Sequence, residues 1–573
     1  MASKKSPPAK IKSKPAPKAP RAKATPIAAH KHADKRKNIP TAELRDWVAD
    51  DEKNPKTILY PRDPSLDPQL VWKGKDEQDS QPLEVPAVPI YIQELIQPQA
   101  IIENVRALPS PNGRGAGGEG QQLALFADFN DLDFTDRVDF YHHDQHWTNR
   151  MILGDSLFVM NSLAEKEGLK GQVQMIYIDP PYGIKFGSNW QVSTRKRDVK
   201  DGRIEDATRQ PEQVKAFRDT WKLGIHSYLS YLRDRLTVAR ELLTESGSVF
   251  VQIGEDNVHL VRALLDEVFG SSNICSQILF VKTASLGSEL LSPVCDYLLW
   301  YAKEKSTVKY RQLFFSKNLG EEGGGQFYTL VELPDRTRRR LTPSEMTDLS
   351  LVPKDTKPYQ LSSLSSQSGG DASRFQVEFR AEIYTPGKGF WKTNWVGISR
   401  LISANRVEES GDSIRYVRFL GDFPATPITS LWRDTGTGSF TEEKVYVVQS
   451  SAKVIQRCLL MTTDPGDLVL DPTCGSGTTA YVAEQWGRRW ITIDTSRVAI
   501  ALARTRLMAG RFPYYLLQDS PEGAKKQNEI TPHPQPLSFE ERGAEGGMRF
   551  GSDLKKGFVY KRVPHVTLKS IAN

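Results

Sequence analysis

Cysteine is scarce in this sequence of 573 residues, which contains only four. Cys275, Cys295, Cys458 and Cys474 are scattered, form no C-x-x-C pair and have no histidine beside them at the spacing of a zinc site. This pattern argues against a disulfide framework and against a structural metal. We expect four reduced thiols and no metal site.

Long apolar runs are also absent. No segment approaches the roughly 18 apolar residues that a membrane helix needs, and the N-terminus lacks the apolar core of a signal peptide. Apolar residues, glycine not counted, make up 38% of the chain, which is normal for a globular protein. We therefore expect a soluble protein of the cytoplasm with no membrane partner.

Acidic residues are almost missing from the N-terminal segment. Residues 1–37 hold twelve Lys and Arg against one acid, so the net charge of +7 belongs to this segment and the rest of the chain is slightly acidic. A Lys, Pro and Ala composition has little to bury, which predicts a disordered basic tail over residues 1–40. Such a tail can screen phosphates without reading sequence, and the alternative is a solubilising tail with no partner.

Composition changes along the chain predict several units, because the chain is too long for one ordinary domain. Strand-like and helix-like segments alternate in two stretches, which predicts a mostly parallel, doubly wound α/β sheet. A stretch rich in Arg, Gly, Ser and aromatics, with short strands, separates them. The predicted units are a tail (1–40), an irregular extension (41–146) with a Gly/Pro-rich insert (108–121), two α/β stretches (147–304 and 436–520), the α+β stretch between them (305–435), and a C-terminal tail (521–573) with a low-complexity insert (531–547).

An apolar, β-branched run stops at an acid, two prolines and an aromatic ring. Residues 173–178 have the length and composition of a buried strand, and the Pro-Pro pair ends it because proline cannot donate to a ladder. Asp179 then lies at the carboxyl end of a strand, where parallel α/β sheets bind ligands. A stiff catalytic clamp is one interpretation. A strand followed by an ordinary proline turn is the other.

A second motif begins where another strand is predicted to end, at Asp471. Gly475 and Gly477 allow a ligand to approach the backbone closely, and a helix N-terminus follows with exposed amides. Asp494 lies nineteen positions after Gly475, at the end of the next strand, where an acid can accept both hydroxyls of a ribose. Because G-x-G-x-x-G and P-loop motifs are absent, the pattern favours a pocket for an adenosine-containing cofactor. The alternative is a tight glycine turn.

Taken together, the two motifs resemble those of the amino-methylating DNA methyltransferases that use S-adenosylmethionine. The residues are Asp179-Pro180-Pro181-Tyr182 and Asp471-Pro472-Thr473-Cys474-Gly475-Ser476-Gly477-Thr478-Thr479. Their order resembles the permuted beta group, which includes modification subunits of type III restriction systems. The resemblance spans roughly residues 147–520 and implies a Rossmann-like sheet, a circularly permuted motif order and an inserted α+β target-recognition region.

The resemblance also implies roles for individual residues. Asp155 corresponds to the acid near the cofactor adenine and Asp494 to the ribose acid. The catalytic set is Asp179, Pro180, Pro181 and Tyr182, and the loop around the methionine end is Asp471, Pro472, Thr473, Gly475, Ser476, Gly477 and Thr478. Two positions depart from the family pattern: the usual aromatic residue is Thr473 here, and the usual Lys-Pro before the cofactor helix is Ser450-Ser451.

The catalytic motif suits a reaction at an exocyclic amine, whose lone pair is delocalised into the base. Asp179 accepting one amine hydrogen and the carbonyl of Pro180 accepting the other would localise that lone pair and aim it at the methyl donor. The base must leave the duplex, and Tyr182 offers a face on which it can stack. No covalent enzyme intermediate is needed, which agrees with the absence of a Pro-Cys dipeptide.

Residues 305–435 are expected to select the DNA sequence through phosphate and base-edge contacts. The candidates are Arg338, Arg339, Lys388, Trp391, Lys392, Arg415 and Arg418, and for each of them alone a solvated basic face or a core tryptophan is the simpler interpretation. Strand-like residues continue almost to Asn573, which is compatible with a longer natural chain.

The expected function is methyl transfer from S-adenosylmethionine to the N6 amine of adenine in double-stranded DNA, in restriction-modification or genome defence. Aspartate at the head of the motif favours adenine. The alternatives are methylation of the cytosine N4 amine, of RNA or of a protein glutamine, and a non-catalytic DNA-binding subunit. A restriction subunit and a second copy of the chain are candidate partners, since the chain has no ATPase or nuclease motif of its own.

Overall fold

The structure is a computed structural model in which the chain divides into two compact units, Met1–Lys53 and Asn54–Asn573. All residues described below lie in the second unit. They are residues 57–60, 70–88, 90, 93–96, 149–180, 224–282, 291–320, 324–436, 450–512, 515–530, 557–560 and 563–573. The predicted basic tail, both low-complexity inserts, Pro181 and Tyr182 lie outside these residues.

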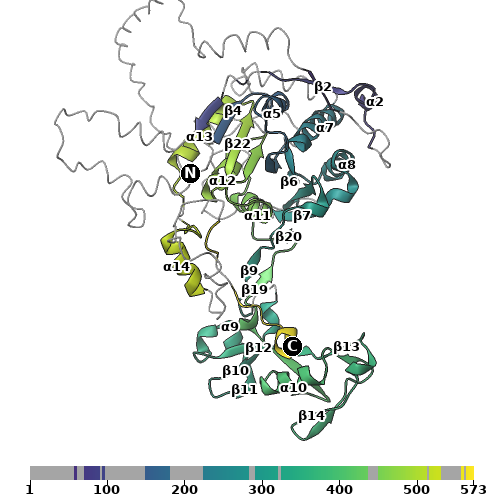
Figure 1. The fold of residues 1–573 in the computed structure, drawn as a ribbon, viewed down its shortest axis with the longest axis vertical. Helices are drawn as coiled ribbons and strands as arrows, with labels where there is room; N and C mark the ends of the chain where they lie inside the picture. Colours follow the sequence, from purple (N-terminus) through teal and green to yellow (C-terminus); the bar gives the residue numbers. More distant parts are fainter. Residues whose placement is uncertain are drawn as a thin grey trace, which may run out of the picture. The chain divides into compact units, whose positions relative to one another are not determined.

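A nine-stranded mixed sheet forms the larger part of the described fold (Figure 1). Its order is β20 (Leu431–Trp432), β7 (Ile274–Val281), β8 (Cys295–Ala302), β6 (Leu243–Ile253), β5 (Val173–Ile178), β21 (Leu468–Asp471), β22 (Arg489–Asp494), β4 (Asn149–Leu153) and β3 (Gln93–Ile96). The five strands from β6 to β4 run parallel, whereas β8 and β3 are antiparallel to their neighbours. The prediction of a mostly parallel sheet is therefore confirmed: β7 and β20 run in the same direction as the central strands, and only β8 and β3 are reversed.

Helices cover both faces of this sheet because alternate residues of a strand point to opposite sides. On β5, Ile176 and Ile178 belong to one buried cluster, whereas Met175 and Tyr177 belong to the other. The first cluster includes α5 (Ser156–Glu165), α7 (Ile225–Leu242) and α8 (Val258–Phe269); the second includes α11 (Ala452–Thr462), α12 (Thr478–Gln485) and α13 (Arg497–Ala509). The doubly wound α/β fold is thus confirmed.

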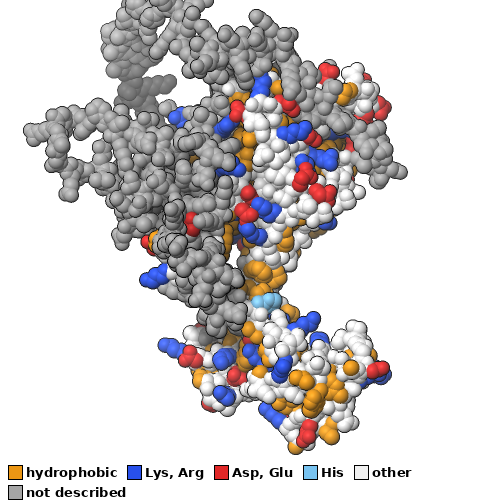
Figure 2. All heavy atoms as spheres, viewed as in Figure 1, with side chains coloured by type: hydrophobic (Ala, Val, Ile, Leu, Met, Phe, Trp, Pro, Cys, Tyr) orange, Lys and Arg blue, Asp and Glu red, His pale blue; other side chains and the backbone are white. Residues whose placement is uncertain are grey.

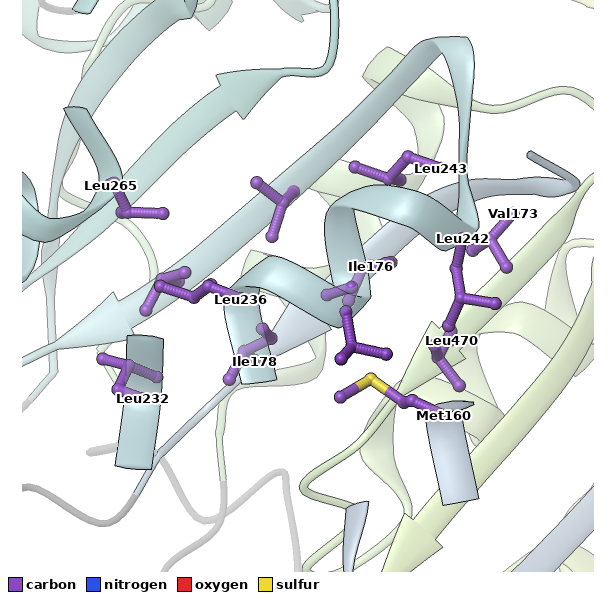
Figure 3. Close-up of a cluster of buried hydrophobic side chains, with 14 of the residues drawn as sticks. Met160, Val173, Ile176, Ile178, Leu232, Leu236, Leu242, Leu243, Leu265 and Leu470 are labelled. Carbon is purple, nitrogen blue, oxygen red and sulfur yellow. The ribbon is translucent and has the colours of Figure 1, made fainter. Parts of the chain in front are cut away.

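The first cluster joins segments from both α/β stretches of the sequence (Figure 3). Met160 of α5, Leu236 of α7 and Leu265 of α8 surround Ile176 of β5 and Leu470 of β21. All five side chains are fully buried or nearly so, and each such apolar side chain contributes about 1.5–3 kcal/mol by burial. The two stretches therefore share one hydrophobic core.

Part of the N-terminal extension packs on the same side of the sheet. Trp72 is buried and its indole nitrogen donates to the Ser230 hydroxyl of α7 at 2.8 Å, while Lys75 pairs with Glu267 of α8 at 2.7 Å. The extension also contains α2 (Lys75–Asp79), and β1 (Thr57–Tyr60) pairs antiparallel with β2 (Leu83–Pro86). The described residues of the N-terminal extension therefore pack as part of the domain that contains the large sheet.

A second, smaller sheet lies within residues 305–435, named here the second region. Its antiparallel order is β11 (Arg338–Arg340), β10 (Leu330–Glu332), β12 (Lys357–Ser363), β18 (Ser413–Phe419) and β17 (Val407–Ser410). Three further pairs are β9 (Phe314–Ser316) with β19 (Ala425–Pro427), β13 (Ser365–Ser366) with β16 (Phe390–Trp391), and β14 (Val377–Phe379) with β15 (Glu382–Tyr384). The short strands expected here are confirmed.

The helices associated with the second region include one from the C-terminal part of the chain. They are α9 (Pro343–Thr347), α10 (Trp395–Ser403) and α15 (Leu568–Ala572). Ala572 of α15 belongs to the same buried cluster as Ile398 and Leu401 of α10, and Arg400 donates to the carbonyl oxygen of Ala572 at 3.0 Å. A remaining helix, α14 (Pro521–Ile530), follows the sheet domain in sequence.

All four cysteines lie in described segments as free thiols, and Cys458 and Cys474 are buried. Among the described residues, no group of three or more potential ligands could hold a metal ion. In the same part of the chain, no helix combines the length and apolar character required to cross a bilayer.

Candidate active site

Four neighbouring parallel strands each end at or next to an aspartate. Along the sheet, Asp179 follows β5, Asp471 ends β21, Asp494 ends β22, and Asp155 lies two residues after β4. The carboxyl ends of parallel strands share one edge of the sheet, so the four acids form a row there. The fold therefore brings together both motifs that the sequence places about 290 positions apart.

The pairing of β5 with β21 places the two motifs side by side. Ile176 is opposite Leu470, and beyond the strand ends the backbone N–H of Asp179 donates to the Thr473 hydroxyl at 2.9 Å. That hydroxyl in turn donates to Asp471 Oδ1 at 3.1 Å. Thr473 therefore links the catalytic motif directly to the glycine-rich loop.

The Asp179 carboxylate accepts two hydrogen bonds on one oxygen. The Ser450 hydroxyl donates to Oδ2 at 2.5 Å, and the Gln252 side-chain amide donates to the same atom at 3.4 Å. Gln252 is held from its other end, because the Tyr177 hydroxyl donates to Gln252 Oε1 at 2.6 Å. Among the described residues, no donor contacts Oδ1 of Asp179.

Burial raises the pKa of the Asp179 carboxyl to about 7, although the side chain keeps some exposure to solvent. The Ser450 hydrogen bond acts in the opposite direction because it favours the ionised form, while the nearby Asp471 raises the pKa further. A carboxyl that titrates near neutral pH can exchange between proton-bound and free forms under ordinary conditions. This property is common in catalytic acids and bases.

The glycine-rich loop has the backbone geometry that the sequence suggested. Gly475 and Gly477 both have positive φ, at 52° and 71°, and Gly477 is the N-cap of α12. A Cβ at Gly477 would lie only 2.6 Å from the Cβ of Ala503 in α13, so a larger residue cannot be accommodated there. Arg506 of α13 also donates to the Thr478 hydroxyl at 2.8 Å, which fixes the loop from the side.

The Asp494 carboxylate is bound by the loop and by the next turn. The backbone N–H of Gly475 donates to one oxygen at 2.9 Å and that of Ser496 to the other at 2.7 Å. Burial raises the pKa of Asp494 to about 6, and burial has the same effect on Asp471. The backbone of Thr495 is a third donor to this carboxylate. A carboxylate has about four acceptor positions, so Asp494 retains room for about one further donor.

Asp155, the last acid in the row, is paired with a cation. Its side chain caps α5 by accepting the Leu157 backbone N–H at 2.8 Å, and Arg235 of α7 donates to the same oxygen at 2.6 Å. The Arg235 guanidinium also lies over the Tyr231 ring, 3.4 Å from its centroid. This corner of the row combines a carboxylate, a cation and an aromatic face.

Of the nine residues predicted for the cofactor, Asp471 and Asp494 end β21 and β22, Thr478 begins α12, and the others lie in the turns that follow β4 and β21. Asp179 and the buried Pro180 follow β5, the neighbour of β21. Sequence reasoning missed Tyr177, Gln252, Arg235 and Arg506, which hold these residues in place. Only Gln252 carried a signal, as a polar side chain within the apolar strand from Val249 to Ile253.

Three of the predicted DNA-contacting residues have structural partners in the second region. Arg338 pairs with Glu332 at 2.8 Å and with Glu408 at 3.2 Å, and Arg339 forms two hydrogen bonds with Glu345. Trp391 is 4% exposed and belongs to the local hydrophobic core. For Trp391 this burial agrees with the simpler interpretation, a core tryptophan, whereas Arg338 and Arg339 form ion pairs that neither interpretation predicted.

The other four predicted residues retain solvent contact. Lys388, Lys392 and Arg415 are exposed and Arg418 is partly exposed. Lys392 donates to the carbonyl oxygen of Ser363 on β12, the residue opposite Arg415 on β18, so these two cations lie in the same neighbourhood. On the face visible in Figure 2, basic side chains of the second region are interspersed with acidic ones.

The comparison with protein families agrees with this site. A family model described as DNA methylase (N6_N4_Mtase) matches residues 173–505, which is more than half of the chain and includes β5, β21 and β22. The chain therefore belongs to the N6/N4 DNA methylase family. The methyl donor of this family is S-adenosylmethionine.

Two individual relatives share 25% and 24% of the aligned residues with this chain. The chain is 25% identical to the type II methyltransferase M.EcaI of Enterobacter cloacae over 371 residues, 64% of this chain and 70% of the relative. It is 24% identical to a probable type III restriction-modification enzyme, the HindVI Mod subunit of Haemophilus influenzae, over 409 residues, 63% of this chain and 50% of the relative. The chain thus spans about half the length of that relative.

The solved structures that match this chain include the M1.HpyAVI complex with S-adenosylmethionine. It shares 14% identity with this chain, covers 62% of this chain and 98% of its own, and superimposes with a TM-score of 0.29.

Proposed function

We propose that this chain transfers the methyl group of S-adenosylmethionine to the exocyclic N6 amine of adenine in double-stranded DNA. The observation that carries the proposal is the contact between Asp179 and Thr473 across the β5–β21 boundary. It places the residue expected to hold the amine beside the loop expected to hold the methyl donor. Membership in the N6/N4 DNA methylase family supports the same reaction.

The residues at the strand ends have the chemistry that the donor molecule requires. Asp494 keeps an acceptor position for a ribose hydroxyl, and the carboxylate–cation–aromatic corner of Asp155, Arg235 and Tyr231 suits an adenine ring. The open backbone at Gly475 and the buried Asp471 suit the cationic methionine end. When bound, S-adenosylmethionine supplies a methyl group on a positively charged sulfur.

The proposed mechanism depends on what Asp179 does to the amine. Its free Oδ1 accepts one amine hydrogen, and the carbonyl oxygen of Pro180 accepts the other, which localises the nitrogen lone pair. Tyr182, which lies outside the described residues, is proposed to stack against the flipped base. Because the carboxyl titrates near pH 7, it can accept the amine proton once the new bond has formed.

Aspartate at the head of the motif is the reason for proposing adenine. Cytosine N4 is the second candidate, because the matching family includes both kinds of amine methylase. The two amines have the same geometry at nitrogen, so the contacts on Asp179 suit either. The shape of the base pocket must discriminate between them, and Tyr182 is proposed to form part of it.

The second region is proposed to recognise the DNA sequence. The chain leaves the large sheet after β8 and rejoins it at β20 and β21, which supports the proposals that this region is an inserted target-recognition region and that the motif order is permuted. Arg415 and Lys392 are the best placed cations for DNA contacts. Restriction-modification is the proposed context, with a restriction subunit and a second copy of the chain as candidate partners, since the relatives include Mod subunits.

Nucleoside analysis tests the proposed reaction directly. The full chain is incubated with S-adenosylmethionine carrying a labelled methyl group and with double-stranded DNA of mixed sequence, and the DNA is digested to nucleosides. We expect label in N6-methyladenine. Label in N4-methylcytosine would replace adenine by the second candidate.

Binding measurements separate the remaining outcomes. A protein that binds DNA but neither binds S-adenosylmethionine nor transfers label would be a non-catalytic DNA-binding subunit. Label in RNA or protein, and none in DNA, would place the substrate outside DNA altogether. Sequencing of methylated sites on the same DNA then identifies the recognition sequence.

A further inference from the structure

We propose that Ser450 is a positioning residue for the catalytic carboxylate, acting together with Gln252 and Tyr177. The hydroxyl of Ser450 and the amide of Gln252 hold Oδ2 of Asp179, which leaves Oδ1 as the oxygen that receives the target amine. This inference rests on the proposed function and identifies residues that neither motif contains.

The three groups that meet at Oδ2 come from distant parts of the chain. Asp179 follows β5, Gln252 lies on the adjacent strand β6, and Ser450 precedes α11 by two residues. The backbone of Asp179 is fixed as well, because its N–H donates to Thr473. The carboxylate is therefore restrained at its backbone and at one of its two oxygens.

The orientation of Gln252 is determined by Tyr177. A primary amide can present either its oxygen or its NH₂ group, and only the NH₂ group can donate to a carboxylate. Because the Tyr177 hydroxyl donates to the amide oxygen at 2.6 Å, the NH₂ group is left for Asp179. Both side chains are almost fully buried, so water does not compete for these contacts.

Two hydrogen bonds to one oxygen have a chemical consequence. A free carboxylate rotates and presents either oxygen, and a restrained one presents Oδ1 in a fixed direction, which favours a productive approach of the amine. The donors also stabilise the ionised carboxylate, whereas burial disfavours it. Other groups near the carboxylate are Asp471, Asp296, Lys282 and Tyr228, and of these only Lys282 favours ionisation.

Ser450 and Thr473 are also the two positions at which the sequence departs from the family pattern. One departure replaces a lysine by a hydroxyl that donates to the Asp179 side chain, and the other replaces an aromatic ring by a hydroxyl that accepts from the Asp179 backbone. Both departures therefore act on the same residue. This convergence explains why the chain can differ at these positions and keep the carboxylate in place.

The first test compares Ser450→Ala with Ser451→Ala in the full chain. Ser451 is a matched control because it makes no side-chain hydrogen bond at the start of α11. We expect Ser450→Ala to lower kcat by about 10-fold to 100-fold, the range represented by a hydrogen bond to a charged group. KM for S-adenosylmethionine and for DNA should stay close to wild type, and the acid limb of the pH–kcat profile should move to higher pH.

Conservative variants extend the same test. Ser450→Thr retains the hydroxyl and should restore most of the lost kcat. Gln252→Met should lower kcat with the same upward movement of the acid limb, and Tyr177→Phe should have a smaller effect of the same kind. A kcat and pH profile of Ser450→Ala equal to wild type overturns the proposal, and so does a loss that appears in KM alone.

A double-mutant cycle supplies a readout that does not depend on methyl transfer. The unfolding free energies of wild type, Ser450→Ala, Asp179→Asn and the double variant are compared at pH 8. We expect the two substitutions to be non-additive. Additive effects overturn the contact itself, even in an inactive protein.

The two proposals fail in different ways. If the wild-type protein methylates DNA and the cycle shows no coupling, the positioning role is wrong and the proposed function stands. If the cycle shows coupling and the wild-type protein transfers no methyl group, the proposed function is wrong and the positioning role in catalysis falls with it.

Discussion

Charged residues are arranged differently in the two sheets of this protein. At the edge of the large sheet, Asp179, Asp471 and Asp494 lie near one another, and burial raises the pKa of each. In the second region, buried acids are paired instead: Asp422 accepts from both terminal nitrogens of the Arg406 guanidinium, at 2.6 and 3.0 Å. The first arrangement is unfavourable for folding, whereas the second stabilises its own sheet once it has formed.

The difference shows that this protein tolerates unfavourable contacts between acids at the strand ends of the large sheet. A row of acids at strand ends opposes folding at neutral pH, because each carboxylate must lose water beside like charges. It is useful only if a ligand uses these groups, and the proposed ligand, a cation with ribose hydroxyls, complements them. Charged residues that neutralise one another, like those of the second region, need no ligand to explain them.

Removal of the Asp179 carboxylate should have the largest effect on activity. Asp179→Ala is expected to lower methyl transfer about 10³-fold, because it removes the acceptor that localises the amine lone pair. S-adenosylmethionine binding, measured by calorimetry, should change little. Asp371→Ala, which removes an exposed acid of the second region, is the control and should remain fully active. Near-normal activity of Asp179→Ala would disprove the mechanism.

Removal of Asp422 should have the largest effect on stability. Asp422→Ala leaves Arg406 without its bidentate partner and also removes the acceptor of the Phe419 backbone N–H, so we expect a loss of about 3 kcal/mol in the free energy of unfolding. Urea denaturation measures this change. A loss below the error of the measurement would show that the paired acids of the second region contribute nothing to its fold.

Neutralisation of Asp494 should act on the cofactor. Asp494→Asn removes one of the two carboxylate acceptors, and we expect the Kd for S-adenosylmethionine to rise about 10-fold to 100-fold. The same measurement on Asp179→Ala provides the contrast, because that residue is not expected to hold the cofactor. Equal losses of affinity in the two variants would contradict the division between catalytic and cofactor-binding acids.

The stability of the wild-type protein should depend on pH through the same acids. A carboxyl whose pKa is higher in the folded state than in the unfolded state stabilises the fold below the unfolded value, near 4, and this contribution is lost as pH rises through the folded value. For Asp179, Asp471 and Asp494 the window is therefore from about pH 4 to about pH 7.

Asp179→Asn tests this pH dependence at one site. The variant should be less sensitive than wild type across that window, and more stable than wild type at pH 8 because a buried charge is removed. Unfolding free energies at pH 5 and pH 8 measure both effects. The contrary result is a free energy of unfolding that rises from pH 5 to pH 8 in the wild-type protein and stays constant in the variant. It would mean that the acids are not buried as charges.

The smallest expected effect concerns DNA affinity. Arg415→Ala should weaken DNA binding a few-fold and reduce the slope of log K against log salt by about one, as expected for one lost phosphate contact. Arg338→Ala is the comparison: it should lower stability and leave that slope unchanged, because its charge is already paired with Glu332 and Glu408. The opposite result would exchange the roles of these two arginines.

Much of the large sheet could be predicted from local patterns. The apolar run over residues 173–178 identified both ends of β5, and the strands predicted to end at Asp471 and Asp494 are β21 and β22. Local patterns did not predict the direction of a strand. The sequence did not reveal that β8 runs antiparallel to β6.

The candidate site was predictable in its motifs and unpredictable in its supporting contacts. Asp179 and Asp494 follow apolar strands, and strand ends are visible in a sequence because proline, glycine and acids interrupt the apolar run. Gln252 and Ser450 give no comparable signal, since their roles depend on which strand lies beside β5. Strand order is a property of the assembled sheet.

The sequence by itself determined that Asp179-Pro180-Pro181-Tyr182 and the loop after Asp471 belong to an amine methylase, because their chemistry and order are written in local residues. Only the tertiary structure decided how they meet. The parallel pairing of β5 with β21 brings Asp179 to Thr473, the pairing of β5 with β6 brings it to Gln252, and Ser450 reaches the same carboxylate from the segment before α11. Hydrogen bonds between residues so far apart form only after the strands have paired.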